Sequence, residues 1–113
     1  MGKKYWSQVG PVLDILVAKY PKAFFPKDSP ETKPLQIGVF TLITGQNPDI
    51  PRPIIGEFLR RYTSKTRYLR ALAACSDRVD LAGEPFEPVS QRARDRATLE
   101  LLARQEKQLK RAA

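Results

Sequence analysis

Two stretches of the chain, residues 60–69 and residues 77–83, gather the residue types that bind nucleic acid. The first contains adjacent arginines, two tyrosines and several hydroxyl side chains, and the second contains an arginine between two aspartates. Arginine and lysine neutralise phosphates, aromatic rings and guanidinium planes stack on unpaired bases, and hydroxyls donate to phosphate or ribose oxygens. The pattern favours a surface for RNA. The alternative is a solvent-exposed helix face with its tyrosines in the core.

Positive charge is concentrated around these stretches. The chain has 113 residues, 20 of them basic and 12 acidic, which gives a net charge of +8. Residues 51–78 hold seven basic and two acidic side chains, so five of the eight excess charges lie in about a quarter of the chain. Localised charge concentrates polyanions at one face and speeds their encounter, whereas scattered charge mainly aids solubility. The distribution therefore favours a polyanionic partner.

The residue types that most enzymes need are scarce. The chain has no histidine, the commonest general base and metal ligand, and its one cysteine, Cys75, has no second thiol for a disulfide or a zinc site. No paired-carboxylate motif or glycine-rich phosphate loop is visible. We therefore expect no enzymatic activity, no metal and no cofactor, and a structural role for Cys75 among small buried residues.

The chain has the size of one domain, and we expect a monomer. No apolar run reaches the length of a membrane span, and residues 1–6 lack the apolar core of a signal peptide. These features predict a cytoplasmic protein that does not bind membranes.

The first half of the chain predicts two helices around an aromatic anchor. The first helix carries one apolar stripe and ends before Pro21, and the Phe24–Phe25 pair that follows is expected in the core. Residues 27–33 are polar and predict a surface loop. A second helix is expected to begin at Pro34 and to end near Gly45. The inward positions are Val9, Val12, Leu13, Leu16 and Tyr20 in the first helix, and Leu35, Val39, Leu42 and Ile43 in the second.

The second half predicts two helices, a hairpin and a last helix. Asp49 or a neighbour is expected to cap a helix whose inward stripe runs to Tyr62, and Thr63–Ser64 is expected to cap the next. Alternation after Ser76 predicts a strand, a turn at residues 82–83 and a return strand at residues 86–89. Ser90 is expected to cap a solvated helix. By elimination, the basic side chains of residues 60–70 are exposed, since they cannot all be buried without partners.

Four motifs in order resemble the ProQ/FinO domain. They are KPLQIGVF at residues 33–40, YTS at 62–64, RYL at 67–69 and DRVDLAG at 77–83, and the YPKAF segment at 20–24 fits as well. The resemblance covers about Val9 to Ala93. It implies an α+β fold, a compact, mainly helical domain with a small β-hairpin. We expect an N-terminal extension at residues 1–8, a ProQ/FinO-like RNA-binding domain at 9–93 and a basic helical tail at 94–113, in a minimal, single-domain version of the family.

The resemblance also implies a function, that of a bacterial RNA chaperone in post-transcriptional regulation. Such domains recognise structured RNA, in small RNAs and at mRNA 3′ ends, through the base of an intrinsic-terminator hairpin and its single-stranded 3′ uridine tail. By position, Tyr68 and Arg78 fall on the family's pocket. The basic positions of the concave face fall on Lys33, Arg52, Arg60 and Arg67. Residues 51–53 fall where the family holds the 3′-terminal nucleotides on a helix N-terminus.

The chain departs from the family pattern at four of these positions. Gln36 stands where lysine is common, Gly56 where arginine occurs, and Thr66 where tryptophan is frequent, and Pro51 replaces a hydroxyl-bearing cap. Arg61 and Lys65 are the candidates to compensate for the missing basic contacts. With them, the expected RNA-binding residues are Lys33, Arg52, Arg60, Arg61, Lys65, Arg67, Tyr68 and Arg78.

Two other classes of protein fit some of these features. A helix-turn-helix DNA regulator also uses a basic helix after a short turn, although no apolar seam for a dimer is visible. A protein-interaction adaptor with the basic face docked on an acidic partner is the other alternative.

Overall fold

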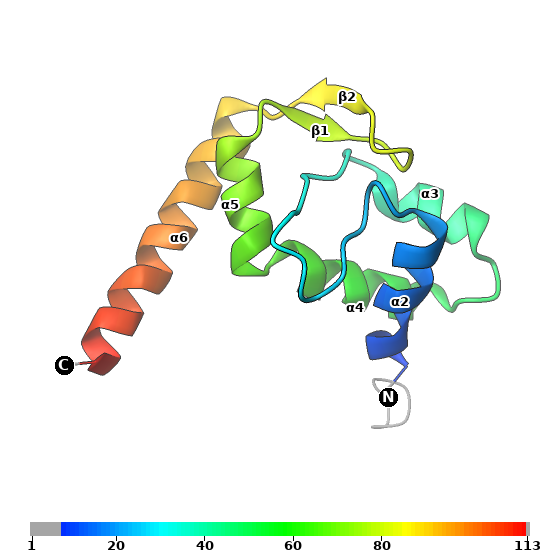
Figure 1. Cartoon of the computed structure of the whole chain (residues 1–113), viewed down its shortest axis with the longest axis horizontal. Coiled ribbons are helices and arrows are strands. Elements are labelled where there is room, and N and C mark those ends of the chain that lie inside the picture. The colour runs from blue at the N-terminus through cyan, green and yellow to red at the C-terminus, as the bar shows by residue number, and fades with distance from the viewer. Residues whose placement is uncertain (1–7, 113) are drawn as a thin grey trace.

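The computed structural model describes residues 8–112, which form five helices and one antiparallel hairpin (Figure 1). This arrangement confirms the predicted α+β class. The predicted N-terminal extension lies outside the described residues, apart from Gln8. In chain order the elements are α2 (Val9–Lys19), α3 (Val39–Gln46), α4 (Arg52–Thr63), α5 (Thr66–Ala74), β1 (Asp77–Val79), β2 (Pro85–Pro88) and α6 (Gln91–Ala112).

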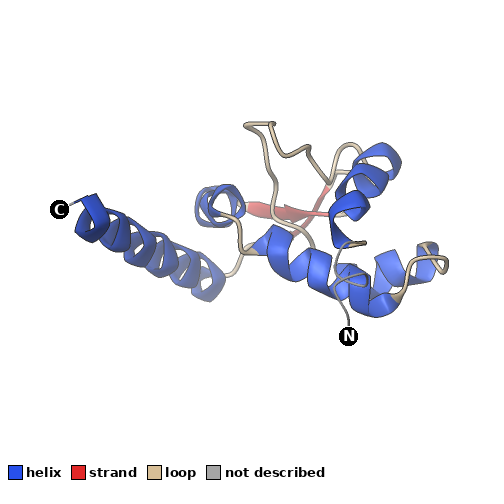
Figure 2. Ribbon diagram, turned by 90° about the horizontal axis from the view of Figure 1, so that it is seen from below, coloured by secondary structure: helices blue, strands red, loops and turns tan. Residues whose placement is uncertain are grey.

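Helix α4 is the central element of the core. It packs against α2 and α3 and leads into α5, while α6 packs on α5 and extends away from the remaining helices (Figures 1 and 2). The ring of Phe24, fully buried between α2 and α4, lies 5.2 Å from the ring centroid of Tyr62 and 5.9 Å from that of Phe58. Aromatic pairs at such distances add about 0.5–1.5 kcal/mol to the gain from burial. The prediction that Phe24 and Phe25 anchor the core is confirmed, since both are buried.

Residues 34–36 form a bridging segment and residues 37–38 a turn, so the prediction of a helix from Pro34 is wrong. Leu35 forms a parallel bridge with Val79 of β1, where the Val79 N–H donates to the Pro34 carbonyl at 2.8 Å and the Gln36 N–H donates to the Val79 carbonyl at 2.9 Å. Gly38, at φ 91°, then turns the chain into α3. The long-range pairing satisfies backbone groups that a helix would have satisfied locally. The segment thus ties the hairpin to the first half of the chain.

The capping residues are partly those that we predicted. Ser90 caps α6, because its Oγ accepts the Ala93 N–H at 3.1 Å. The predicted caps Asp49 and Thr63–Ser64 are wrong, since α4 and α5 begin after Pro51 and Lys65 without a side-chain cap. The Ser64 hydroxyl instead donates to the Arg60 carbonyl at 2.7 Å and so satisfies the end of α4.

The hairpin is short and docks against the exit of α2. Strands β1 and β2 pair antiparallel, with Arg78 opposite Glu87 and a bulge after Arg78. In the turn, Asp80 Oδ1 accepts the Ala82 and Glu84 N–H groups. Gly83 has φ 82°, and a Cβ there would lie 2.5 Å from Lys22 Cβ, so only glycine fits. This close approach fixes the orientation of β1 and therefore of Arg78.

Helix α6 is continuous from Gln91 to Ala112, so the predicted boundary at residue 93 falls inside it. Its first half packs on α5 through Ala97, which is buried, and Arg94 donates to the Cys75 carbonyl at 3.3 Å. Cys75 is half-buried and Ala74 is exposed, which corrects the expectation that this segment lies in the core. None of the helices in residues 8–112 combines the length and hydropathy that a bilayer crossing requires.

Candidate nucleic-acid interface

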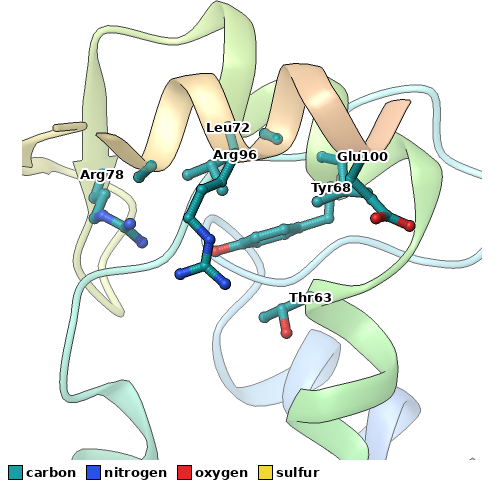
Figure 3. A pocket seen from close by; sticks show the side chains of 9 residues that line it. Thr63, Tyr68, Leu72, Arg78, Arg96 and Glu100 are labelled. Atoms are coloured by element: carbon teal, nitrogen blue, oxygen red, sulfur yellow. The ribbon is translucent and has the colours of Figure 1, made fainter. Parts of the chain in front are cut away.

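A cavity of about 510 Å³ opens where α5, β1 and α6 meet (Figure 3). It brings together Tyr68 and Arg78, the two side chains that the family resemblance assigns to a pocket. Arg78 reaches it from β1 and Tyr68 from α5, while the third wall comes from α6. The lining residues are Thr63, Tyr68, Leu69, Leu72, Arg78, Ala93, Arg96, Ala97 and Glu100.

Tyr68 presents its hydroxyl rather than its ring. Only 4% of the residue is exposed, and the ring meets Tyr62 edge-on at 5.9 Å, so neither face is free to stack on a base. The Oη accepts the Leu35 N–H at 3.0 Å. Burial raises the pKa of the phenol, while the Leu35 hydrogen bond and the charge and hydrogen bonding of Arg78 act in the opposite direction. The phenol is therefore neutral near pH 7 and retains a proton to donate.

Arg78 has donor capacity that the fold does not use. Its Nη1 donates to the Leu35 carbonyl at 3.0 Å. Within residues 8–112 it forms no ion pair, although Asp77 and Asp80 are close in the sequence. A guanidinium has five N–H donors, and Figure 3 shows that of Arg78 directed toward Arg96 and the hydroxyl end of Tyr68.

Three polar residues of the cavity were not predicted from the sequence: Thr63, Arg96 and Glu100. Arg96 and Glu100 lie one turn apart on α6, which the alternation of charged and small residues had indicated to be solvated. The available signal was the spacing of Ala93 and Ala97, four residues apart, which places two small residues on one face of the helix.

Arg67 does not enter the cavity, although it precedes Tyr68. Its guanidinium donates to four backbone carbonyls, at 2.6 Å for Pro26, 3.0 Å for Lys27, 3.1 Å for Ser29 and 3.2 Å for Phe25. It also lies over the Tyr62 ring, 5.8 Å from the centroid. These contacts hold the polar loop against α4 and α5.

The α4 cations are exposed and share one carboxylate. Arg60 Nε and Arg61 Nε both lie 2.9 Å from Glu57 oxygens. These hydrogen bonds, that of Arg60 first, lower the pKa of Glu57 to about 2, against a smaller opposing effect of burial. The side chains of Arg60 and Arg61 remain 70% and 48% exposed. Lys65 is exposed nearby, so the three cations form a solvent-facing group around the end of α4.

The start of α4 offers fewer free amides than a typical helix. Pro51 and Pro53 have no N–H, and the Ile54 and Ile55 N–H groups both donate to the Pro51 carbonyl. Only the amide of Arg52 remains for a ligand among these first positions. The Arg52 guanidinium lies over the Phe40 ring at 5.6 Å from its centroid. Capture of a 3′ end by backbone amides, as the resemblance implies, therefore has little support at this site.

Lys33 and Gln36 lie between the loop and the hairpin. Lys33 Nζ lies 5.9 Å from the centroid of the Phe25 ring, and the residue is half-buried. Gln36, in the position where lysine is common, is 8% exposed. The structure brings neither residue into the cavity with Tyr68 and Arg78.

Comparisons with solved structures give the same fold. A FinO-like RNA chaperone from Neisseria meningitidis superposes with a TM-score of 0.67 at 25% identity, over 80% of this chain and 90% of its own. A ProQ homolog from Legionella pneumophila gives a TM-score of 0.67 at 26% identity, over 82% of this chain and 80% of its own.

Sequence comparisons agree with the structural ones. The chain is 38% identical to the RNA chaperone ProQ of Shewanella oneidensis over 106 residues, which are 90% of this chain and 49% of that protein. It is 38% identical to the ProQ of Aeromonas salmonicida over 79 residues, 67% of this chain and 37% of that protein. The chain thus spans about half the length of the first relative and less of the second. These relatives are named as RNA chaperones, the function that the family resemblance implied, and not as enzymes. The ProQ/FINO family profile matches residues 6–113. The chain belongs to the ProQ/FinO family.

Proposed function

We propose that this chain is a cytoplasmic RNA-binding chaperone that recognises intrinsic-terminator hairpins and their 3′ uridine tails in small RNAs and mRNAs. The observation that carries the proposal is the cavity between α5, β1 and α6, where a neutral phenol hydroxyl and a guanidinium with unused donors face the same space. Family membership and the RNA chaperone names of the relatives support the same function.

The tail is bound in the cavity through its backbone and its end. Arg78 donates to a phosphate as a charge-assisted pair, and the Tyr68 hydroxyl donates to the same phosphate or to the neighbouring ribose. Glu100 lines the same cavity. Its carboxylate, which also pairs with Arg104 at 3.0 Å, accepts a hydrogen bond from a terminal ribose hydroxyl, and a terminal phosphate would replace that hydroxyl. This set of groups favours a free 3′ hydroxyl.

The stem is bound by the exposed cations outside the cavity. Arg60, Arg61 and Lys65 follow one another around the end of α4, and Arg52 and Lys33 add charge at the start of α4 and beside the loop. Such contacts to phosphates carry no sequence information and supply much of the affinity. Each phosphate that is neutralised adds about 0.7–0.9 to the slope of log affinity against log salt concentration.

A DNA-binding regulator is less consistent with the packing of α5. In a helix-turn-helix protein the second helix enters the major groove with one face free. Here α5 follows α4 after a short turn, but α6 packs along it and buries its own Ala97 in the contact. The cavity of about 510 Å³ lies beside α5, between it, β1 and α6.

Binding to three RNAs tests the proposal. The RNAs are a terminator hairpin with a uridine tail and a free 3′ hydroxyl, the same RNA with a 3′ phosphate, and the same RNA extended beyond the tail. We expect at least about tenfold tighter binding to the first, the effect of one lost charge-assisted contact. Equal binding to all three would show a general phosphate-binding surface and would overturn the assignment of the cavity to the RNA end.

A further inference from the structure

We infer that Arg96 of α6 is a second phosphate contact of the cavity, so that α6 forms part of the RNA-binding site. The inference rests on the proposed function and adds to it a residue that lies outside the motifs of the family resemblance.

The packing of α6 on α5 directs Arg96 into the cavity. Ala97, next to it in the sequence, is 1% exposed and sets the close approach of the two helices. Ala93, one turn earlier, also lines the cavity and leaves space beside Arg78. Figure 3 shows the Arg96 guanidinium at the hydroxyl end of Tyr68, on the side of the cavity that Arg78 also faces.

The charge of Arg96 is not neutralised within the part of the chain that the structure describes. Its natural helical partner is Glu100, four residues later, but the Glu100 carboxylate accepts from Arg104 Nε at 3.0 Å. Arg104 is held in turn by the Thr66 hydroxyl, which accepts from its Nη1 at 3.2 Å. No hydrogen bond or ion pair within residues 8–112 involves the Arg96 side chain, so all its guanidinium donors are available.

Two unneutralised guanidinium groups around one cavity select an anion. Arg78 and Arg96 repel each other when the cavity holds only water, and an anion between them reverses this interaction. Their planar donor sets match a phosphate, and the Tyr68 hydroxyl supplies a further donor from the floor. The ligand that fits is a phosphodiester of the tail, held from β1, α5 and α6 at once.

The test compares two arginines on the same helix. Arg96→Ala removes the proposed contact. Arg92→Ala is the control: Arg92 lies one turn earlier on α6, carries the same charge, is exposed and does not line the cavity. Arg96→Lys keeps the charge but not the planar donor set. The probes are the uridine-tailed terminator hairpin and the same hairpin without its tail. Because the Arg96 side chain has no partner in the fold, the thermal unfolding midpoints of these variants are expected to match that of the unmodified chain.

We expect Arg96→Ala to lower the affinity for the tailed RNA about tenfold or more, and Arg96→Lys to recover part of this loss. Arg92→Ala should lower the affinity less than about twofold. For the untailed hairpin, both alanine variants should show an equally small loss of affinity. If Arg96→Ala behaves as Arg92→Ala on an RNA whose tail the unmodified chain does recognise, the role of Arg96 is overturned and the proposed function stands. If the unmodified chain binds both RNAs equally, the proposed function is overturned, and the inference with it.

Discussion

Two regions built around neighbouring elements use arginine in opposite ways. At the loop of residues 25–29, the Arg67 guanidinium donates to four backbone carbonyls between 2.6 and 3.2 Å. At the cavity, Arg78 donates to a single carbonyl at 3.0 Å, and Arg96 makes no contact of this kind within residues 8–112. Both regions are basic in the sequence. The difference shows that a cation is available for RNA only to the extent that the fold leaves its donors unused.

The clearest way to break this comparison is Arg67→Ala. The variant leaves four carbonyls without their donor, and we expect it to lower the free energy of unfolding by about 2–3 kcal/mol. Urea unfolding followed by circular dichroism measures the loss. Arg70→Ala is the matched control, because Arg70 is exposed on the same helix, and it should change stability by no more than about 0.5 kcal/mol. Normal stability with lost RNA binding in Arg67→Ala would assign Arg67 to the RNA surface instead.

Tyr68→Phe acts on fold and cavity together. It removes the acceptor of the buried Leu35 N–H, which should cost about 1–3 kcal/mol of stability, and it removes the proposed donor to RNA. Tyr20→Phe provides the control, because the Tyr20 hydroxyl donates to Gln46 Oε1 at 2.6 Å and lies outside the cavity. Unfolding and RNA titration are measured on both. Equal RNA affinities would show that the Tyr68 hydroxyl does not contact RNA.

Arg78→Ala separates the stability of the fold from the affinity for RNA. Because Arg78 donates to one backbone carbonyl and forms no ion pair within residues 8–112, we expect a stability loss of about 1 kcal/mol or less and an RNA affinity loss of about tenfold or more. Fluorescence anisotropy with a labelled hairpin measures the second. A variant that unfolds as readily as Arg67→Ala would show that Arg78 is structural.

Glu57→Gln sharpens the comparison at the α4 surface. The change releases Arg60 and Arg61 from their shared carboxylate, so RNA affinity should rise severalfold at low salt and the salt slope should steepen. An unchanged slope would show that these arginines do not contact phosphates.

The pH dependence of stability provides a second readout for Glu57. Its pKa falls from 4.5 to about 2 in the fold, so the pairing stabilises the chain fully above pH 4.5 and is lost as the pH falls through about 2. The two arginines that pair with Glu57 are exposed to solvent, so the effect is small. The stability difference between the unmodified chain and Glu57→Gln should therefore shrink below pH 4.5. A difference that persists at pH 2 would contradict the assignment.

Local signals predicted most of the helices and the hairpin. The apolar stripe of α2, the Phe24 anchor, the Ser90 cap and the alternation after Ser76 all act over a few residues, and the structure confirms them. Long-range contacts decided what the sequence missed. Pro34 looks like a helix start, but its carbonyl pairs with Val79, far along the chain.

In the site, too, local motifs predicted some residues and long-range contacts decided the others. Tyr68 and Arg78 were found through motifs, and the structure brings them into one cavity. The role of Arg67 depends on carbonyls about 40 residues earlier, so no local pattern separates it from Arg78. Arg96 was missed because its position is defined by the packing of α6 on α5, and a charged helix face gives no sign of that contact.

A cycle of one mutation and one RNA modification tests the central claim most directly. The affinities of the unmodified chain and of Arg78→Ala are measured for the uridine-tailed hairpin with a 3′ hydroxyl and with a 3′ phosphate. If the cavity holds the 3′ end, the phosphate should weaken binding about tenfold for the unmodified chain and less than about twofold for Arg78→Ala, because both changes act at one place. Equal losses in both proteins would place the RNA end elsewhere and contradict the account.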